Sequence, residues 1–303
     1  MKVRIGYGLG VRTALNDTSF ATFVDTLERL SFDSLWLSER IGAEAPDPLV
    51  ALAYAAGRTS RLKLGMSVMV LPGRNPVVLA KELATLDRLS SGRLLPAFGL
   101  GVADPNEQQA FGVERKERAR RFDEALAVVR ACWTDDVVHH DGTFFRYDGL
   151  RVLPKPVQRP PDVWLGGIAA TELTRVGRVG DGWLPSFVTP ADAERGRASV
   201  EKVAAEHGRT IDPEHFGALV PYARTEADLP DALVAGLAAR RPDLADPRVL
   251  VPCGWKALVE LIAGFVAVGT SKFVVLPILE PASDDDWVAH LEDAAGVLLP
   301  LQT

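Results

Sequence analysis

The chain has 303 residues, of which 47% are hydrophobic and 24% charged, and its 34 Lys and Arg against 40 Asp and Glu give a net charge of −6. A chain of this length can bury a sizeable core, and its negative charge disfavours general nucleic-acid binding. No run approaches the ~18 apolar residues of a membrane helix, and the two cysteines lack the paired spacing of a zinc or redox motif. We therefore expect one cytoplasmic domain over residues 1–303 that acts on a small molecule and binds no metal, nucleic acid or membrane.

The first sixty residues alternate between strand and helix patterns. Residues 3–9 indicate a strand, and apolar side chains between Phe20 and Leu30 recur at helical spacing. Residues 34–37 indicate a second strand, and residues 49–58 a second helix. The chain therefore begins as two strand and helix units in succession.

A complete strand, helix and strand unit follows. Residues 62–70 are too short and too apolar for a surface element, so they predict a core strand. Asn75 can cap a helix whose first residue is Pro76, and Gly92 closes that helix before residues 93–100 form the next strand. Two strands joined by one amphipathic helix must run parallel.

The alternation breaks after Gly101, which indicates an insertion. Residues 114–133 predict a long charged helix, and residues 137–147 a hairpin that turns at Asp141-Gly142. The strand and helix alternation resumes at residues 162–165. The remaining predicted elements are a helix from Ala170, strands at 183–187 and 216–222, helices at 191–207, 229–239 and 255–268, and a last strand at 272–276.

This tally of about eight strands alternating with helices predicts a (β/α)8 TIM barrel with an insertion after the fourth strand. An open doubly wound sheet is the alternative. It would require two Rossmann halves, and the glycine-rich segments at Gly6 to Gly10 and Gly99 to Gly101 both lack the third glycine of that fingerprint. The barrel is therefore preferred.

Two glycines, Gly166 and Gly167, lie between a predicted strand and a predicted helix. Glycine there lets a phosphate approach the backbone, and the helix start at Ile168 and Ala169 offers unpaired N–H groups. A tight turn without a ligand explains the same pair equally well.

Three acidic residues follow predicted strands and could handle protons. Glu39 and Arg40 close the second strand, where a carboxylate beside a guanidinium could move a proton, hold an anion or form a surface ion pair. Asp104 and Glu107 lie just past Gly101, and solvation of a loop explains them about as well.

Several motifs together resemble the bacterial-luciferase-like flavin and deazaflavin oxidoreductases. They run in the right order over nearly the whole chain: Leu71-Pro72-Gly73-Arg74-Asn75-Pro76, Ala84-Thr85-Leu86-Asp87 with Ser91-Gly92-Arg93, Trp164-Leu165-Gly166-Gly167, Gly180-Asp181-Gly182-Trp183-Leu184-Pro185 and Ser271-Lys272-Phe273-Val274. The resemblance implies a TIM barrel that holds FMN or coenzyme F420 with its ring across the strand ends.

The resemblance also implies where the cofactor lies. Deazaflavin-dependent members carry a bulge with a non-prolyl cis peptide in the third strand, at the place of Ser67-Val68 here, and the phosphate would lie at the Gly166-Gly167 turn. We therefore expect the cofactor to contact Gly8, Ser67, Val68, Gly99, Gly101, Gly166, Gly167, Ile168 and Ala169.

This chain departs from the family pattern at two positions. Arg40 stands where many relatives have histidine, and Val102 stands where relatives often have Trp or Glu. A histidine proton donor is therefore absent at that place, and Glu39 or Asp104 becomes the expected catalytic residue.

The resemblance favours an F420-dependent oxidoreductase that passes hydride between the deazaflavin and a small organic substrate. One alternative is an FMNH2-dependent monooxygenase, and another is a barrel that binds flavin or deazaflavin without turnover, which Arg40 and Val102 keep open. A homodimer is an option. Arg12, Arg40 and Arg74 lie on predicted loops that could meet the acidic F420 tail.

Overall fold

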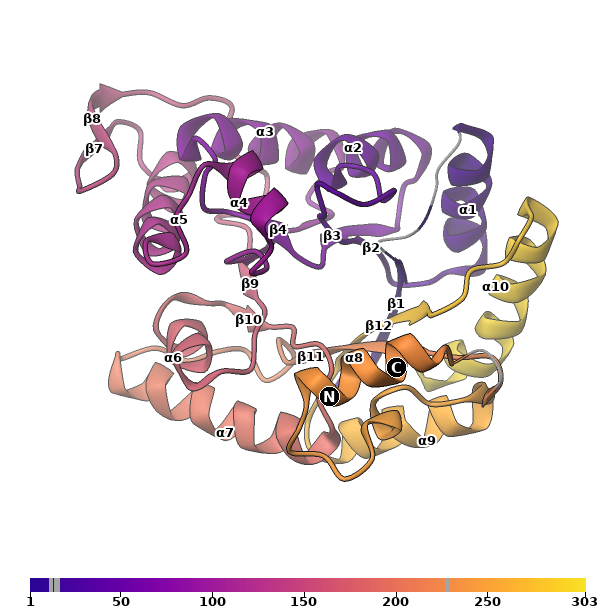
Figure 1. Cartoon of the computed structure of the whole chain (residues 1–303). Coiled ribbons are helices and arrows are strands. Elements are labelled where there is room, and N and C mark those ends of the chain that lie inside the picture. The colour runs from indigo at the N-terminus through magenta and orange to yellow at the C-terminus, as the bar shows by residue number, and fades with distance from the viewer. Residues whose placement is uncertain (11–12, 14–16, 227–228) are drawn as a thin grey trace.

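Parallel strands run between two groups of helices, α2 to α5 on one side and α6 to α9 on the other (Figure 1). The structure is a computed structural model that describes residues 1–10, 13, 17–226 and 229–303. The barrel strands are β1 (Arg4–Leu9), β2 (Ser34–Leu37), β3 (Lys63–Met66), β4 (Met69–Val70), β5 (Leu94–Leu95), β6 (Ala97–Gly99), β9 (Trp164–Leu165), β10 (Gly182–Trp183), β11 (Gly217–Tyr222) and β12 (Lys272–Pro277). The helices are α1 (Asp17–Leu30), α2 (Pro48–Arg58), α3 (Pro76–Leu89), α4 (Pro105–Phe111), α5 (Arg118–Thr134), α6 (Ala170–Val179), α7 (Pro190–Glu206), α8 (Asp231–Arg240), α9 (Gly254–Ala267) and α10 (Asp284–Leu298).

The strands form a ring. One sheet has the order β11-β12-β1-β2-β3-β5, and the other has the order β10-β9-β6-β4. The sequence segments β3 and β4 follow each other across Ser67 and Val68, and β5 and β6 follow each other across Pro96, so both strand pairs link the two sheets. On the other side, parallel bridges from Trp183 to Phe216 and from Ser186 to Leu219 join β10 to β11. The predicted (β/α)8 barrel is confirmed, and the strands that the structure describes do not form the open doubly wound sheet.

Strand β10 is shorter than the predicted strand at residues 183–187. Pro185 has no N–H to donate to the ladder, although its carbonyl still accepts from the N–H of Leu219 at 2.9 Å. The strand direction therefore continues to Ser186, but regular pairing ends at Trp183.

Two tryptophans fill the inside of the barrel because neighbouring strands present glycine to them. A Cβ on Gly6 would lie 2.8 Å from Nε1 of Trp36, and a Cβ on Gly65 would collide with the same indole. A Cβ on Gly182 would lie 2.5 Å from Trp164. Both indoles are almost fully buried, so they form a solid floor beneath the upper end of the barrel.

Helix α3 follows the expected start signals. The Asn75 side chain accepts the N–H groups of Val77 and Val78 at 3.0 and 3.2 Å, and Pro76 occupies the first helical position. The buried face includes Leu79, Leu83 and Leu86. Leu89, the last residue of the helix, is 73% exposed.

The predicted insertion lies between β6 and β9 and contains a helix that was not predicted from the sequence. Helix α4 begins after Asp104, and α5 starts at Arg118 rather than at the predicted residue 114. The hairpin of β7 (Val138–Asp141) and β8 (Arg146–Leu150) turns at residues 143–144, two residues later than predicted, with the Gly142 N–H donating to the Phe145 carbonyl at 3.0 Å. The hairpin lies at the outer edge of the molecule beyond α5 (Figure 1).

Helix α10, which was also not predicted, covers a buried polar network. The hydroxyls of Tyr7 and Tyr222 lie 2.6 Å apart, and the Tyr222 hydroxyl lies 2.5 Å from Nε2 of His290 on α10. Nδ1 of His290 has no hydrogen-bond partner within the described ranges. Burial is the main reason why the pKa of His290 falls from 6.5 to about 4.

This pKa shift makes folding stability depend on pH. The fold prefers the neutral imidazole, so its stabilisation is complete above pH 6.5 and is lost as the pH falls through about 4. We expect the loss to reach about 3 kcal/mol, at 1.36 kcal/mol per pKa unit. Urea unfolding between pH 4 and pH 8 gives the free energy of unfolding of the wild-type chain and of His290→Gln at each pH. We expect the wild-type chain to lose more stability than His290→Gln as the pH falls. An equal pH dependence in the two proteins would contradict the prediction.

Candidate functional site

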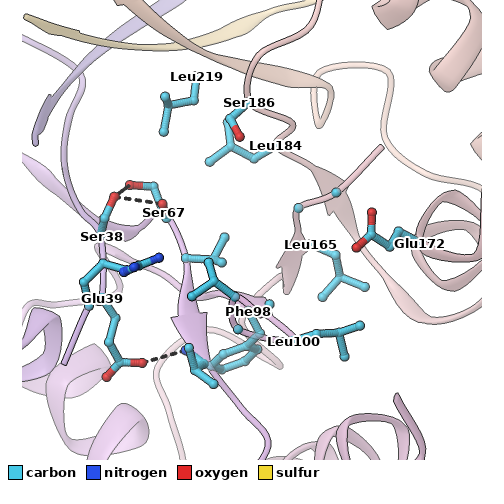
Figure 2. A pocket seen from close by; sticks show the side chains of 18 of the residues that line it. Ser38, Glu39, Ser67, Phe98, Leu100, Leu165, Glu172, Leu184, Ser186 and Leu219 are labelled. Atoms are coloured by element: carbon cyan, nitrogen blue, oxygen red, sulfur yellow. Dashed lines mark hydrogen bonds between the residues drawn. The ribbon is translucent and has the colours of Figure 1, made fainter. Parts of the chain in front are cut away.

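A cavity of about 340 Å³ opens where the barrel strands end (Figure 2). Its walls come from the carboxyl ends of β2, β4, β6, β9, β10 and β11, which is where barrel enzymes bind their ligands. Apolar side chains line much of it, and Phe98, Leu165, Leu184 and Leu219 point into the same space in Figure 2. The polar lining residues include Ser38, Glu39, Arg40, Ser67, Glu107, Glu172, Arg175, Ser186 and Arg240. The cavity therefore combines apolar walls with a few charged groups, as small-molecule sites do.

The third strand carries the expected bulge at this cavity. The peptide bond between Ser67 and Val68 is cis, so that prediction is confirmed. The Ser38 hydroxyl donates to the Ser67 carbonyl at 2.9 Å and lies 3.2 Å from the Ser67 hydroxyl (Figure 2). A Cβ on Gly99 would lie 2.5 Å from Cγ2 of Val68, and a Cβ on Gly166 would lie 3.6 Å from its Cγ1. Val68 thus stands between two glycines as an apolar wall that a flat ring could contact.

The Gly166-Gly167 turn presents backbone donors to an anion. Gly167 has a φ of +95°, which glycine adopts easily. The N–H groups of Ile168 and Ala169 each donate to Oε2 of Glu172 at 2.9 Å. This carboxylate lies over Gly167, in the space that a Cβ would need. The turn already holds one oxyanion from its own chain, so its donors fit a phosphate of the same charge sign.

Glu39 is a buried carboxylate at the end of β2. Its exposed fraction is 6%, its Oε2 accepts the Val70 N–H at 2.7 Å, and its Oε1 pairs with Arg74. Burial raises the pKa of Glu39, and the nearby Arg74 opposes that rise. The side chain therefore lines the cavity as predicted but is held in place by Val70 and Arg74.

Asp104, the second expected catalytic residue, does not line the cavity. Its Oδ1 accepts the N–H groups of Asn106 and Glu107 at 2.8 and 3.2 Å, so it caps helix α4. Asp104 followed by Pro105 and, three residues on, Glu107 is a recognisable helix start. Its carboxylate therefore accepts backbone N–H groups at the start of α4, and a catalytic role for Asp104 stays a prediction.

Glu107 takes the position at the cavity that was expected of Asp104. It is 3% exposed, and its Oε1 accepts the Ile41 N–H at 3.0 Å and lies 3.4 Å from Nε of Arg40. Its Oε2 has no hydrogen-bond partner within the described part of the chain. A buried carboxylate oxygen without a donor is costly, which makes Glu107 a candidate to meet a ligand.

The other expected cofactor contacts divide into two groups. Ser67, Val68, Gly99, Gly101, Gly166 and Gly167 line the cavity, while Gly8, Ile168 and Ala169 do not. Gly8 lies inside the barrel, where a Cβ would lie 3.1 Å from Cγ1 of Val274, and its contact with the cofactor stays a prediction. Ile168 and Ala169 face the turn through their N–H groups alone.

Two other kinds of site, a metal centre and a membrane span, are not found among the described residues. No cluster of three or more His, Cys, Asp and Glu side chains has the arrangement of a metal site among residues 1–10, 13, 17–226 and 229–303. Within the same ranges, every helix is too short or too polar to span a bilayer.

The sequence model of a family described as luciferase-like monooxygenase matches residues 10–252. A phthiodiolone/phenolphthiodiolone dimycocerosates ketoreductase of Mycobacterium tuberculosis is 29% identical over 232 residues, which are 66% of this chain and 60% of that protein. An F420-dependent glucose-6-phosphate dehydrogenase of Kineococcus radiotolerans is 33% identical over 175 residues, 54% of this chain and 51% of that protein. The chain thus spans about half to three fifths of the length of these relatives.

Solved structures share the fold over the whole chain. An F420-dependent secondary alcohol dehydrogenase in complex with an F420-acetone adduct aligns with a TM-score of 0.82 and 19% identity, covering 100% of both chains. The oxygenating constituent of 3,6-diketocamphane monooxygenase from Pseudomonas putida, in complex with FMN, aligns with a TM-score of 0.76 and 17% identity, covering 99% of both chains.

Proposed function

Since the chain belongs to the luciferase-like monooxygenase family of oxidoreductase enzymes, we propose that it is an F420-dependent oxidoreductase that acts on a small carbonyl compound or the corresponding alcohol. The observation that carries the proposal is one cavity with the Ser67-Val68 bulge on one wall and the Gly166-Gly167 turn on another. When bound, the deazaflavin would supply or accept the hydride at its C5 carbon. The names of the similar ketoreductase and alcohol dehydrogenase support a carbonyl or alcohol substrate.

The residues of this chain would position the ring and hold the phosphate. Val68 offers an apolar face between Gly99 and Gly166, and the Ser38 hydroxyl fixes the Ser67 carbonyl. The N–H groups of Ile168 and Ala169 would donate to the phosphate once the Glu172 carboxylate moves away. These contacts orient the cofactor, which is the main contribution of a protein to cofactor chemistry.

Two buried carboxylates at the cavity could balance the proton that accompanies hydride transfer. We assign that role first to Glu39, because burial raises its pKa and a raised pKa lets a carboxyl group carry a proton. Glu107 offers the carboxylate oxygen that is left without a donor in the described structure, and it could accept a hydrogen bond from a substrate hydroxyl. Both side chains lie at the mouth, where the substrate would sit above the ring.

An FMN-dependent monooxygenase is the second candidate function. The barrel aligns with an FMN-bound monooxygenase component, and the same turn could hold the FMN phosphate. A barrel that binds either cofactor without turnover is distinguished from both by the absence of reaction. We also propose that the protein acts in the cytoplasm, and a homodimer stays a prediction.

Equilibrium titration with F420, FMN and FAD, followed by cofactor fluorescence, tests the proposal. We expect F420 to bind most tightly, and binding of FMN without binding of F420 would overturn this first choice. We expect Gly167→Ala to weaken F420 binding, since its Cβ would enter the space over the turn. Gly208→Ala is the matched control, because Gly208 also has a positive φ of +67° but has no atom within 4 Å of a Cβ.

A further inference from the structure

A second cavity lies beside the Gly166-Gly167 turn. It also has a volume of about 340 Å³, and it shares Arg240 with the first cavity. Ile168, the residue after Gly167, is part of its wall. Trp183 lines it too and donates from Nε1 to the Gly167 carbonyl at 2.8 Å. A ligand whose phosphate is held at the turn would therefore lie next to this second cavity.

The second cavity contains more positive than negative charge. Arg241 is 5% exposed. Its three guanidinium nitrogens all donate hydrogen bonds of 2.9 Å or less to the carboxylates of Asp192 and Asp243. Arg195 pairs with Asp192 at 2.5 Å. Those two carboxylates therefore serve two guanidiniums, and Arg240 is the third guanidinium of the cavity.

Arg240 has no carboxylate partner in the described ranges of the chain. Its guanidinium lies 4.6 Å from the ring centroid of Phe187, a residue that lines the first cavity. An aromatic ring orients a guanidinium without neutralising its charge. Arg240 is thus a cation that packs on the Phe187 ring at the junction of the two cavities and is not neutralised by a carboxylate of the described residues.

We propose that this second cavity binds an acidic chain that extends from the cofactor beyond its phosphate, with Arg240 contacting a carboxylate of that chain. The proposal rests on the proposed function and deepens it, because F420 carries a glutamyl tail beyond its phosphate whereas FMN ends at the phosphate. The three arginines that the sequence suggested for this tail differ from Arg240, because two of them face a carboxylate and the third is not described by the structure. Arg12 lies outside the described residues, Arg40 faces Glu107, and Arg74 pairs with Glu39.

Binding constants for four ligands test the proposal: F420 with several glutamates, the F420 form without glutamates, the deazaflavin Fo without phosphate or tail, and FMN. We expect the wild-type chain to bind glutamylated F420 about fivefold more tightly than the form without glutamates, and Arg240→Gln to remove that difference. Binding of Fo should be unchanged in Arg240→Gln, which shows that the barrel remains folded. Arg146→Gln is the control variant, because Arg146 is an 80% exposed side chain on the hairpin.

The outcomes separate the two proposals. Equal affinities for both F420 forms, or an unchanged tail preference in Arg240→Gln, would overturn the tail site while the F420 function stands. A weakening of Fo binding by Arg240→Gln would also overturn it, because Fo has no acidic chain. Binding of FMN with no binding of any deazaflavin would overturn both proposals.

Discussion

Replacing Asp87 with alanine is expected to lower the free energy of unfolding by about 3–5 kcal/mol. Asp87 is fully buried near the end of α3. Its Oδ2 accepts hydrogen bonds from the N–H groups of Val157 and Gln158 at 2.6 and 3.0 Å, and its Oδ1 accepts one from Nε2 of Gln158 at 2.6 Å. One carboxylate therefore attaches α3 to the segment that returns from the insertion to the barrel, and alanine would leave three partly buried donors without this acceptor.

Chemical denaturation in urea measures this loss as a shift in the unfolding midpoint at unchanged slope. Asp148→Ala is the control, because the Asp148 side chain is 97% exposed and pairs only with the exposed His139 in the described structure. We expect that control to change stability by no more than about 0.5 kcal/mol. A loss below about 1 kcal/mol in Asp87→Ala would show that the segment does not depend on this carboxylate.

Replacing Glu172 with alanine is expected to tighten the binding of phosphate-bearing cofactors by about tenfold or more. The Glu172 carboxylate now occupies the N–H groups of Ile168 and Ala169, each at 2.9 Å. A phosphate at the turn must first break these hydrogen bonds, and hydrogen bonds to a charged group are worth about 1.5–3 kcal/mol. Alanine removes this competing anion, so the dissociation constant should fall for both F420 and FMN.

Ligands without phosphate provide the internal control for Glu172. Fo and riboflavin should bind the wild-type chain and Glu172→Ala equally, because they do not need the turn. Glu172→Gln should give an intermediate affinity, since it keeps a carbonyl acceptor but loses the negative charge. If all ligands gained equally, the substitution would have reshaped the cavity rather than freed the amides. The lost helix cap should cost about 1 kcal/mol of stability, which a thermal scan would detect.

Most of the barrel could be predicted because its elements carry local signals. The apolar strand at residues 62–70 and the Asn75-Pro76 start of α3 depend on neighbours in sequence, and both are present in the structure. Helices α4 and α10 were missed although Asp104-Pro105 and Ser283 mark their starts. Helix α4 has only seven residues, so its sequence reads equally well as a loop. Helix α10 begins with three consecutive aspartates, Asp284 to Asp286, which also suit a loop, and its buried residues lie further along at His290 to Leu298.

The roles of the site residues were harder to predict, because each role depends on which side chains lie nearby in the folded chain. Asp104 and Glu107 are three residues apart, yet one caps α4 and the other is buried at the cavity. The partner of Glu39 is Arg74, on a loop after another strand. The Gly166-Gly167 turn could be predicted from its position between a strand and a helix. The hydrogen bonds of Glu172 to the N–H groups at that turn are visible only in the structure.

The fit between the Trp36 indole and the glycines beside it has a consequence for how this barrel can change over generations. Any side chain at position 65 would collide with that ring, and one at position 6 would crowd it. Because protein interiors are close-packed, a larger residue at position 6 or 65 must be matched by a smaller residue at position 36. The three positions should therefore covary among homologues, as a single inherited unit shared by three adjacent strands.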